Sequence, residues 1–297
     1  MVTKYWLLVL LWSTSAGSFA QLKKQFSIEN SSECEEVHLT LKAKTGNCYI
    51  RPSQNNDILN VFSNQDLEEY GHNFSNEVVN RKCQVKLQFH QYQTDGVGHK
   101  ISYQVLGANS ANTDKFWKVY LTEFKPYQLN LDFGLGNANV DLSGLSVKKF
   151  KINTGSADVN IAYGSGVENR VTMDTFLVKV DVGSVTVKQL HLAKSQIILA
   201  EVGFGNLSLD FSGKPLVNNQ VKCSVGAGNL VIALPDQQIP LLVKVSDSWL
   251  CSIQLSKSLK KIGDNKYANA AYAQASKNAL TFDLDVSMGK IIFKESH

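Results

Sequence analysis

A short unit recurs along this chain: a glycine, a small or polar residue, and then apolar residues that alternate with polar ones. Alternation with a period of two is typical of a β-strand with one buried side, and glycine permits the positive φ of a sharp corner. No single unit can bury its apolar side alone, so the units are expected to stack. Clear copies begin at Gly136, Gly155, Gly183, Gly205 and Gly228, and weaker ones at Gly46 and Gly289.

The spacing of the units suits a stack of rungs. The central glycines follow one another at intervals of 19, 28, 22 and 23 residues, which is within the range of solenoid repeats. Helical periodicity is almost absent. The sequence therefore predicts an all-β, β-helix-like stack of short strands.

Stacking places equivalent residues in columns along the long axis. The residue after each glycine should form a column of short polar side chains, which can bond neighbouring backbone at a turn. A ligand-binding ladder of asparagines is the alternative interpretation. The expected members are Asn47, Asn137, Ser156, Ser184, Asn206 and Asn229.

The first third of the chain is less regular. Val37–Leu41, Lys82–His90 and Lys100–Leu106 predict longer strands, and the aromatic stretch Phe116–Leu121 suits a packed cap or an edge. The polar, Ala-rich stretch Gly263–Lys277 predicts a loop or a short helix. We expect an irregular β portion over 21–126 and regular repeats over 127–297, together forming one continuous domain.

The N-terminus predicts export. Lys4 precedes an apolar run from Tyr5 to Trp12, which is too short to span a bilayer, and small residues follow. Residues 1–20 are therefore expected to be a signal peptide cleaved after Ala20, which would leave the protein in the periplasm or at the cell surface. An uncleaved N-terminal anchor is the rival interpretation.

Five cysteines in an oxidising compartment can pair, but the number is odd, so at least one thiol should stay free. The alternation around Cys83 predicts that its side chain points into the core. The spacing leaves the disulfide connectivity open among Cys34, Cys48, Cys83, Cys223 and Cys251.

The charge pattern does not favour nucleic acid as a partner. The formal net charge of +4 is spread along the chain, whereas binding to a phosphate backbone needs a concentrated basic surface. One basic cluster is present at Lys257, Lys260 and Lys261, where a solvated loop is the simpler interpretation and contact with an anionic polymer the alternative.

No pattern for a cofactor or a metal stands out. Gly134–Gly136, Gly203–Gly205 and Gly226–Gly228 lack the third glycine of a dinucleotide-binding loop. The histidines show no metal-ligand spacing. Asp95 and His99 could share a loop, although Asp95-Gly96 is also a common hairpin turn.

Catalytic residues are likewise not predicted. Enzymes that cleave polysaccharides use clustered carboxylates, whereas the acids of the repeats stand singly and suit a solvated outer face. A polar face able to grip a glycan or a protein is the alternative. These acids are Asp141, Asp158, Asp181, Glu201 and Asp210.

The segment Leu129–Leu145, with Val147–Phe150 and the unit that begins at Gly155, resembles the toast-rack family and the wider set of bacterial adhesin-head and envelope-stress domains. The resemblance covers roughly Tyr127 to Pro235. It implies a single-stranded, right-handed β-helix-like solenoid outside the cytoplasmic membrane of a bacterium. It carries no established catalytic residues across to this chain.

Three functions are compatible with these observations. The favoured one is a non-enzymatic envelope protein, a rigid β scaffold that binds an envelope protein or a surface polysaccharide. The alternatives are an enzyme acting on polysaccharide, which rests on analogy of fold, and an accessory to envelope-stress signalling. We expect no cofactor, no nucleic acid and no membrane span after cleavage, and self-association through the rung ends is an open alternative.

Overall fold

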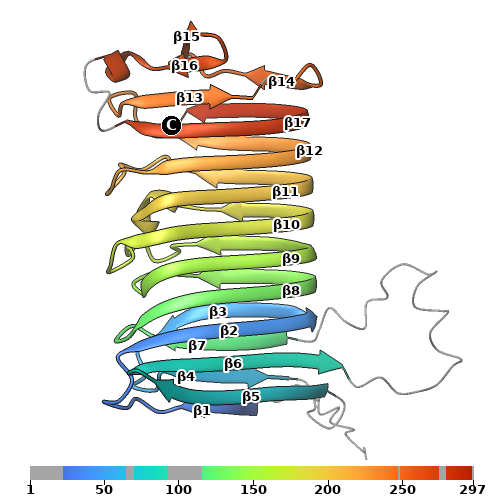
Figure 1. The fold of residues 1–297 in the computed structure, drawn as a ribbon, viewed down its shortest axis with the longest axis vertical. Coiled ribbons are helices and arrows are strands. Elements are labelled where there is room, and N and C mark those ends of the chain that lie inside the picture. The colour runs from blue at the N-terminus through green and yellow to red at the C-terminus, as the bar shows by residue number, and fades with distance from the viewer. Residues whose placement is uncertain (1–22, 65–69, 92–115, 247, 274–278, 296–297) are drawn as a thin grey trace, which may run out of the picture.

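The computed structural model describes residues 23–64, 70–91, 116–246, 248–273 and 279–295. They form a tall stack of strands (Figure 1), in which every described strand belongs to one mixed sheet. Among these residues there are two short 3-10 helices, η2 (Leu190–Ala193) and η3 (Ala270–Ala273), and no α-helix. The expectation of an all-β fold is confirmed.

Six long strands build the centre of the stack. Each one bends at a corner, so that it passes along one side of the core and returns along the other (Figure 1). We call such a bent strand a rung and its two halves the first and second arms. Neighbouring rungs pair in parallel. The rungs are β8 (Pro126–Asp141), β9 (Ser146–Ala162), β10 (Met173–Val187), β11 (Ser195–Asp210), β12 (Gln220–Leu234) and β17 (Leu280–Glu295).

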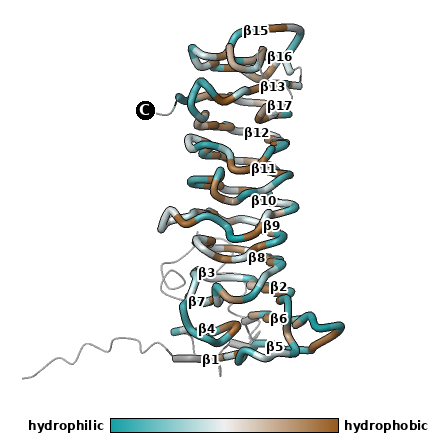
Figure 2. Tube along the Cα trace, turned by 90° about the vertical axis from the view of Figure 1, so that its left-hand side faces the viewer, coloured by the Kyte–Doolittle hydropathy of each residue, from teal (hydrophilic) through white to brown (hydrophobic). Residues whose placement is uncertain are grey.

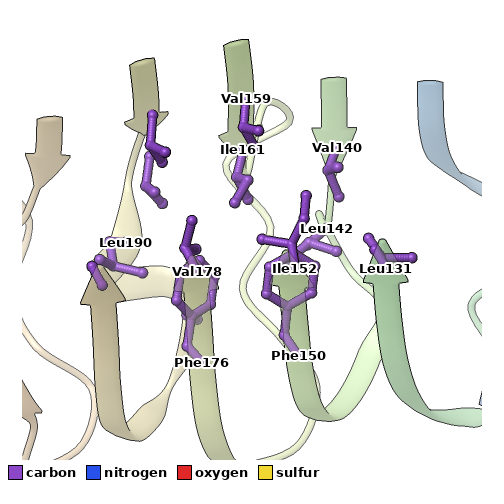
Figure 3. Packing of buried hydrophobic residues seen from close by; sticks show 14 of the residues in the cluster. Leu131, Val140, Leu142, Phe150, Ile152, Val159, Ile161, Phe176, Val178 and Leu190 are labelled. Carbon is purple, nitrogen blue, oxygen red and sulfur yellow. The ribbon is translucent and has the colours of Figure 1, made fainter. Parts of the chain in front are cut away.

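The core lies between the arms. Buried and exposed residues alternate along the rungs, as expected of strands that bury one side. Figure 2 shows the same alternation as hydrophobic and hydrophilic stretches along the chain trace. In the centre, Phe150 stacks on Phe176 with ring centroids 4.9 Å apart, and Ile152 and Val178 continue this layer (Figure 3). The two columns of this layer thus each receive one apolar side chain from β9 and one from β10.

A column of glycines turns the rungs at their corners. Gly205 has φ of 143° and Gly228 has φ of 147°, a region that favours glycine. A Cβ on Gly205 would also overlap the carbonyl oxygen of Gly183 in the neighbouring rung. Both the turn and the close approach of the rungs therefore require glycine.

The rung β9 departs from the predicted alignment. Ala157, not Gly155, pairs with the corner glycine Gly136, so Ser156 lies one position before the corner and not in the polar column. Asp158 takes the place expected for Ser156. The prediction was wrong because it took Gly155 as the equivalent of the corner glycine Gly136, whereas Gly155 lies opposite Gly134, two positions earlier. Register is set by the burial of the whole strand.

The N-terminal end continues the stack with divided rungs. β2 (Glu36–Thr45) and β3 (Asn47–Ser53) meet at Gly46 and pair in parallel with β8. β6 (Lys82–Gln91) and β7 (Phe116–Thr122) pair in parallel with β2 and β3. Three antiparallel strands complete this end: β1 (Lys23–Ile28), β4 (Leu59–Ser63) and β5 (Tyr70–Val79).

The described strands of the irregular N-terminal portion therefore belong to the same sheet as the central rungs. The aromatic stretch Phe116–Leu121 is part of β7 and lies between β3 and β4, with Trp117 only 1% exposed. It is an internal strand, and the expectation of a cap or an edge was wrong. The strand predicted over Lys100–Leu106 and the signal peptide over 1–20 lie outside the described residues.

At the C-terminal end the order of strands in space differs from their order in the chain. β17 pairs with β12 on one side and with β13 (Leu241–Val245) and β14 (Cys251–Gln254) on the other. β16 (Lys266–Ala268) pairs antiparallel with β13 and β15 (Lys260–Gly263). The stretch Gly263–Lys277 was expected to be a loop or a short helix. Its described part holds the short strand β16 and the 3-10 helix η3.

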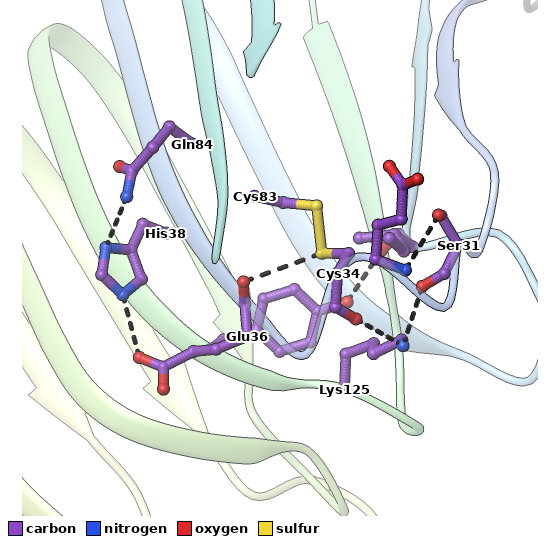
Figure 4. Close-up of a disulfide and its surroundings, with 10 residues drawn as sticks. Ser31, Cys34, Glu36, His38, Cys83, Gln84 and Lys125 are labelled. Carbon is purple, nitrogen blue, oxygen red and sulfur yellow. Dashed lines mark hydrogen bonds and ion pairs between the residues drawn. A yellow bond between two sulfur atoms is a disulfide. The ribbon is translucent and has the colours of Figure 1, made fainter. Parts of the chain in front are cut away.

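One disulfide links the loop just before β2 to β6 at the N-terminal end. Cys34 and Cys83 are bonded with their Cα atoms 5.5 Å apart, and both side chains are buried (Figure 4). Cys83 points into the core as predicted, but as half of a disulfide. Cys48, Cys223 and Cys251 are free thiols, and burial raises the pKa of the Cys48 and Cys223 thiols. A disulfide of this kind is typical of an oxidising, extracytoplasmic compartment.

Candidate binding face

The outer side of the first arms is a polar face built from several rungs. Because neighbouring strands pair in parallel, their outward side chains fall into columns across the stack. One column contains Gln84, His38, Gln128 and Lys149, from β6, β2, β8 and β9. The next contains Lys86, Thr40, Asn130 and Lys151 from the same four strands.

These columns line a shallow hollow of about 270 Å³. Its polar side chains offer imidazole, hydroxyl, amide and ammonium groups, and no carboxylate is among the residues that line it. Lys149 and Lys151 supply its positive charges. The lining residues are His38, Leu39, Thr40, Gln84, Gln128, Leu129, Asn130, Lys149 and Lys151.

A nearly buried carboxylate holds this face in position. Oε1 of Glu36 lies 2.9 Å from Nε2 of His38 and accepts a hydrogen bond of 2.8 Å from Gln128. Its Oε2 accepts a hydrogen bond of 2.7 Å from Lys148. On the other side of the imidazole, Gln84 donates to Nδ1 of His38 at 3.1 Å (Figure 4). The two hydrogen bonds together place the ring proton on Nε2.

The electrostatics of Glu36 follow from these contacts. Burial alone would raise the pKa of the carboxyl, but the hydrogen bonds from Lys148, His38 and Gln128 outweigh it and lower the pKa to about 2. Glu36 is therefore ionised at neutral pH and already satisfied. We conclude that it orients His38 and Gln128 and is not itself exposed to a ligand.

A second hollow adjoins the first along the same face. It has a volume of about 550 Å³ and shares Lys151 with the first hollow. Gly134 and Gly155 contribute no side chain to it, which leaves the surface depressed at this point. Its lining residues are Asp132, Phe133, Gly134, Lys151, Asn153, Thr154, Gly155, Lys179 and Asp181.

The charges of the second hollow are mixed. Asp132 lies 4.0 Å from Lys42, and Lys179 lies 3.4 Å from Glu201, each pair being about half exposed. Such exposed pairs contribute little to stability. Their side chains therefore remain available to a ligand at small energetic cost.

Most acids of the repeats have structural partners. Oδ1 of Asp141 accepts hydrogen bonds from Ser143 and Gly164, and Asp158 accepts one from the backbone N–H of Ser184. Asp210 accepts backbone hydrogen bonds in the loops after two successive rungs, which lowers the pKa of its carboxyl despite partial burial. Of the five acids that the sequence singled out, only Asp181 lines either hollow.

The polar column at the corners bonds along the stack. Asn137 donates to the side-chain oxygen of Asn47 at 3.2 Å, and Asn229 donates to that of Asn206 at 2.9 Å. We expected such side chains to bond neighbouring backbone, and in these pairs they bond each other. The column thus connects rungs that lie next to one another.

Within the described ranges, no group of three or more histidine, cysteine, aspartate or glutamate side chains could hold a metal ion. In the same part of the chain, no helix has the length and apolar character needed to cross a bilayer. Asp95 and His99 lie outside the described residues. Of the basic cluster at the C-terminal end, Lys257 lies in a turn, as expected, whereas Lys260 and Lys261 lie on the exposed strand β15. The cluster is far from the polar face (Figure 1).

The sequence indicated a polar outer face only as an alternative and did not predict the residues of the first hollow, because they come from strands that begin as far apart as Glu36 and Ser146. The available signal was the outward half of each alternating strand. His38, Thr40, Gln128 and Asn130 all stand at such positions, between the buried residues of β2 and β8.

The protein is thus of the all-β class, built as a disulfide-linked stack of parallel rungs with a polar outer face. Residues 17–188 match the family model described as the N-terminal domain of toast_rack, DUF2154. The chain therefore belongs to the toast-rack family, as its resemblance implied. The match crosses the boundary expected near residue 126. No curated protein matches the chain.

Three solved structures are similar to this chain. A proposed cell adhesion protein from Clostridium sporogenes has 15% sequence identity and a TM-score of 0.44, covering 93% of this chain and 100% of its own. A proposed adhesin from Bacteroides fragilis has 10% identity and a TM-score of 0.30, with coverages of 92% and 97%. A proposed lipid-binding protein from Parabacteroides distasonis has 10% identity and a TM-score of 0.31, with coverages of 93% and 94%.

Proposed function

We propose that this protein is a non-enzymatic, exported scaffold whose polar face binds a surface polysaccharide that carries acidic groups. The observation that carries the proposal is the first hollow, in which amides, a hydroxyl and two lysines surround a depression without a carboxylate. Amides and hydroxyls are suitable partners for sugar hydroxyls, and ammonium groups for carboxylates or phosphates.

The geometry of the stack supports a polymer as the ligand. Successive rungs are about 4.8 Å apart, so the two adjoining hollows present a repeating row of polar groups to an extended chain. Lys151 lies in both hollows and would contact the polymer where it passes from one to the other. A linear polymer can use many weak contacts of this kind at once.

Glu36 supports the same interpretation. By fixing His38 and Gln128 before any ligand arrives, its hydrogen bonds reduce the entropy that binding would cost. The rest of the face stands on paired strands and not on loops, which keeps it rigid.

The test is binding of the exported chain to polygalacturonate, an acidic polymer, with dextran as a neutral comparison. Replacing both Lys149 and Lys151 with alanine should weaken binding to polygalacturonate at least about tenfold, or ~1.4 kcal/mol. The matched control, Lys260→Ala with Lys261→Ala, removes the same charge from the C-terminal end and should bind as the wild type. Equal loss in both variants, or no binding of any acidic polysaccharide, would contradict the proposal.

One observation favours an enzyme as the alternative function. Asp132 and Asp181 line the same hollow, and a pair of carboxylates is the usual requirement for cleaving a glycosidic bond. If the wild-type chain released reducing ends from the polymer, and Asp132→Asn or Asp181→Asn abolished this release, the alternative would replace our proposal.

We also infer that the rungs wind as a single-stranded, right-handed solenoid and that export proceeds by cleavage after Ala20 into the periplasm or onto the surface. The parallel pairing of consecutive rungs supports the first inference, and the disulfide supports export. N-terminal sequencing of the exported chain should then begin at Gln21. A chain that retains its first residues and stays with the membrane fraction would favour an N-terminal anchor.

A further inference from the structure

The corners of the rungs carry an exposed apolar ridge along one edge of the stack. The residue just before each corner pairs in register with its equivalent in the next rung. Four of these residues are large, apolar and exposed, and Phe204 is 65% exposed. In order along the stack, the ridge consists of Leu135, Ser156, Val182, Phe204, Ala227 and Met288.

The ridge extends onto the C-terminal end. The carbonyl oxygen of Leu250 accepts a hydrogen bond of 3.1 Å from the corner glycine Gly289, next to Met288. Leu250 is 42% exposed and its neighbour Trp249 is 91% exposed. The six rungs alone span roughly 24 Å at the usual spacing of strands. The column is apolar along this length except at Ser156, and an exposed apolar surface of this extent usually marks an interface.

A column with few side chains, which we call the groove, runs beside the ridge. The position before each ridge residue is a glycine in four of the six rungs, namely Gly134, Gly155, Gly203 and Gly226. The groove therefore lies next to a column of large apolar side chains. This edge thus carries both a ridge and a groove that could receive the ridge of another copy. In these six rungs, Asp181 alone carries a charge in the groove column, and it shares a hollow with Lys179.

We propose that this edge binds a second copy of the same chain, around a two-fold axis parallel to the stack. Such an axis brings the ridge of each copy against the groove of the other, since the two columns lie side by side. Each copy then contributes the same surface, as in an isologous dimer. The groove shares Gly134, Gly155 and Asp181 with the second hollow. The inference is still independent of the polysaccharide proposal, because the first hollow, which carries that proposal, contains no residue of the ridge or the groove.

The flanking charges select this arrangement. In this arrangement, each rung of one copy faces the same rung of the other. The outward residue three positions before the ridge residue would then lie opposite the residue two positions after the ridge residue of the partner. No facing pair then has like charges, and Asp285 of one copy faces Lys290 of the other at the C-terminal rung. In the opposite, antiparallel arrangement, Asp132 would face Asp285 of the other copy, and this repulsion would offset the attraction of Lys179 to Glu201. The parallel arrangement therefore has the better balance of charges.

The test is sedimentation velocity of the exported chain over a range of concentrations. The wild type should form dimers, and Phe204→Asp should weaken association at least tenfold, since it places a charge at the centre of the ridge. Phe204 is exposed, so this variant should keep the unfolding midpoint of the wild type. The matched control, Ile262→Asp, changes another exposed apolar residue, 55% exposed on β15, and should dimerise normally.

A charge exchange tests the direction of packing. Asp285→Lys and Lys290→Asp should each weaken the dimer, and the double variant should recover it, because the opposite charges still face each other. Single variants that dimerise like the wild type would overturn the parallel arrangement. A monomeric wild type, an unaffected Phe204→Asp, dissociation by Ile262→Asp, or a ridge that binds lipid vesicles instead of a second copy would overturn the proposal as a whole.

Discussion

The central rungs and the N-terminal end of the stack are built from the same kind of strand but are held together differently. In β8–β12 each rung pairs in parallel with the next one in the chain, and the same interactions recur at every step. At the N-terminal end the strands are divided, several pair antiparallel, and a disulfide joins segments separated by 49 residues. Repetition stabilises the centre, whereas individual interactions stabilise the end.

The largest expected effect concerns the corners of the central rungs. Gly205→Ala should destabilise the protein by about 3–5 kcal/mol, because the new Cβ meets both an unfavourable φ and the backbone of Gly183. Urea unfolding followed by circular dichroism measures this change. The matched control is Ala157→Gly at the equivalent corner of β9, which should cost less than about 1 kcal/mol. Similar losses in both variants would show that the corner glycines are not special.

The second effect concerns the N-terminal end. Replacing Cys34 and Cys83 together with serine should cost about 2–4 kcal/mol, since the unfolded chain loses a long closed loop. Hydrogen exchange should rise first in β2 and β6, next to the lost bond, and not in β10–β12. Cys251→Ser removes a free thiol and serves as the control. Uniform loss of protection over all rungs would mean that the two regions unfold together.

The third effect is a dependence of the protein's stability on pH, which arises from Glu36 in the N-terminal half. The folded-state pKa of Glu36, about 2, is lower than the ordinary value of 4.5 for a glutamate carboxyl. Its stabilisation is therefore complete above about pH 5 and is lost as the pH falls toward 2. Glu36→Gln should remove about 1–3 kcal/mol at neutral pH and flatten the acid limb of the stability curve. An acid limb identical to that of the wild type would contradict this assignment.

The smallest effect concerns the asparagine column. The hydrogen bond between Asn229 and Asn206 is exposed, so Asn229→Ala should cost only about 0.5–1 kcal/mol. A double-mutant cycle with Asn206→Ala isolates the energy of the pair. A coupling energy of zero would mean that the column contributes nothing beyond the corners themselves.

The sequence predicted the centre of the fold because its information is local. Alternation and corner glycines recur within each rung, and they are sufficient to indicate strands, corners and stacking. The register of one rung, β9, was predicted wrongly. Gly155 stands close enough to the corner to be mistaken for it, and only the pairing of Ala157 with Gly136 and Leu135 with Ser156 resolves the alignment.

The ends and the polar face could not be predicted because they depend on contacts between distant segments. The aromatic residues of β7 suggested a cap or an edge, but β7 lies between β3 and β4 and buries Trp117 in the core. The disulfide was one of several possible pairings. His38, Gln84, Gln128 and Lys149 become neighbours only when β6, β2, β8 and β9 stack in an order that the chain itself does not follow.

The position of β17 has a consequence for the order in which the molecule can assemble. β13 and β14 are synthesised before β17, yet in the finished stack they are separated from β12 by it. Until residues 280–295 emerge, β13 and β14 lack their parallel neighbour, so the last turns of the stack cannot close by simple addition from one end. A chain interrupted before Leu280 would thus lose an interior rung and leave the outer strands without support.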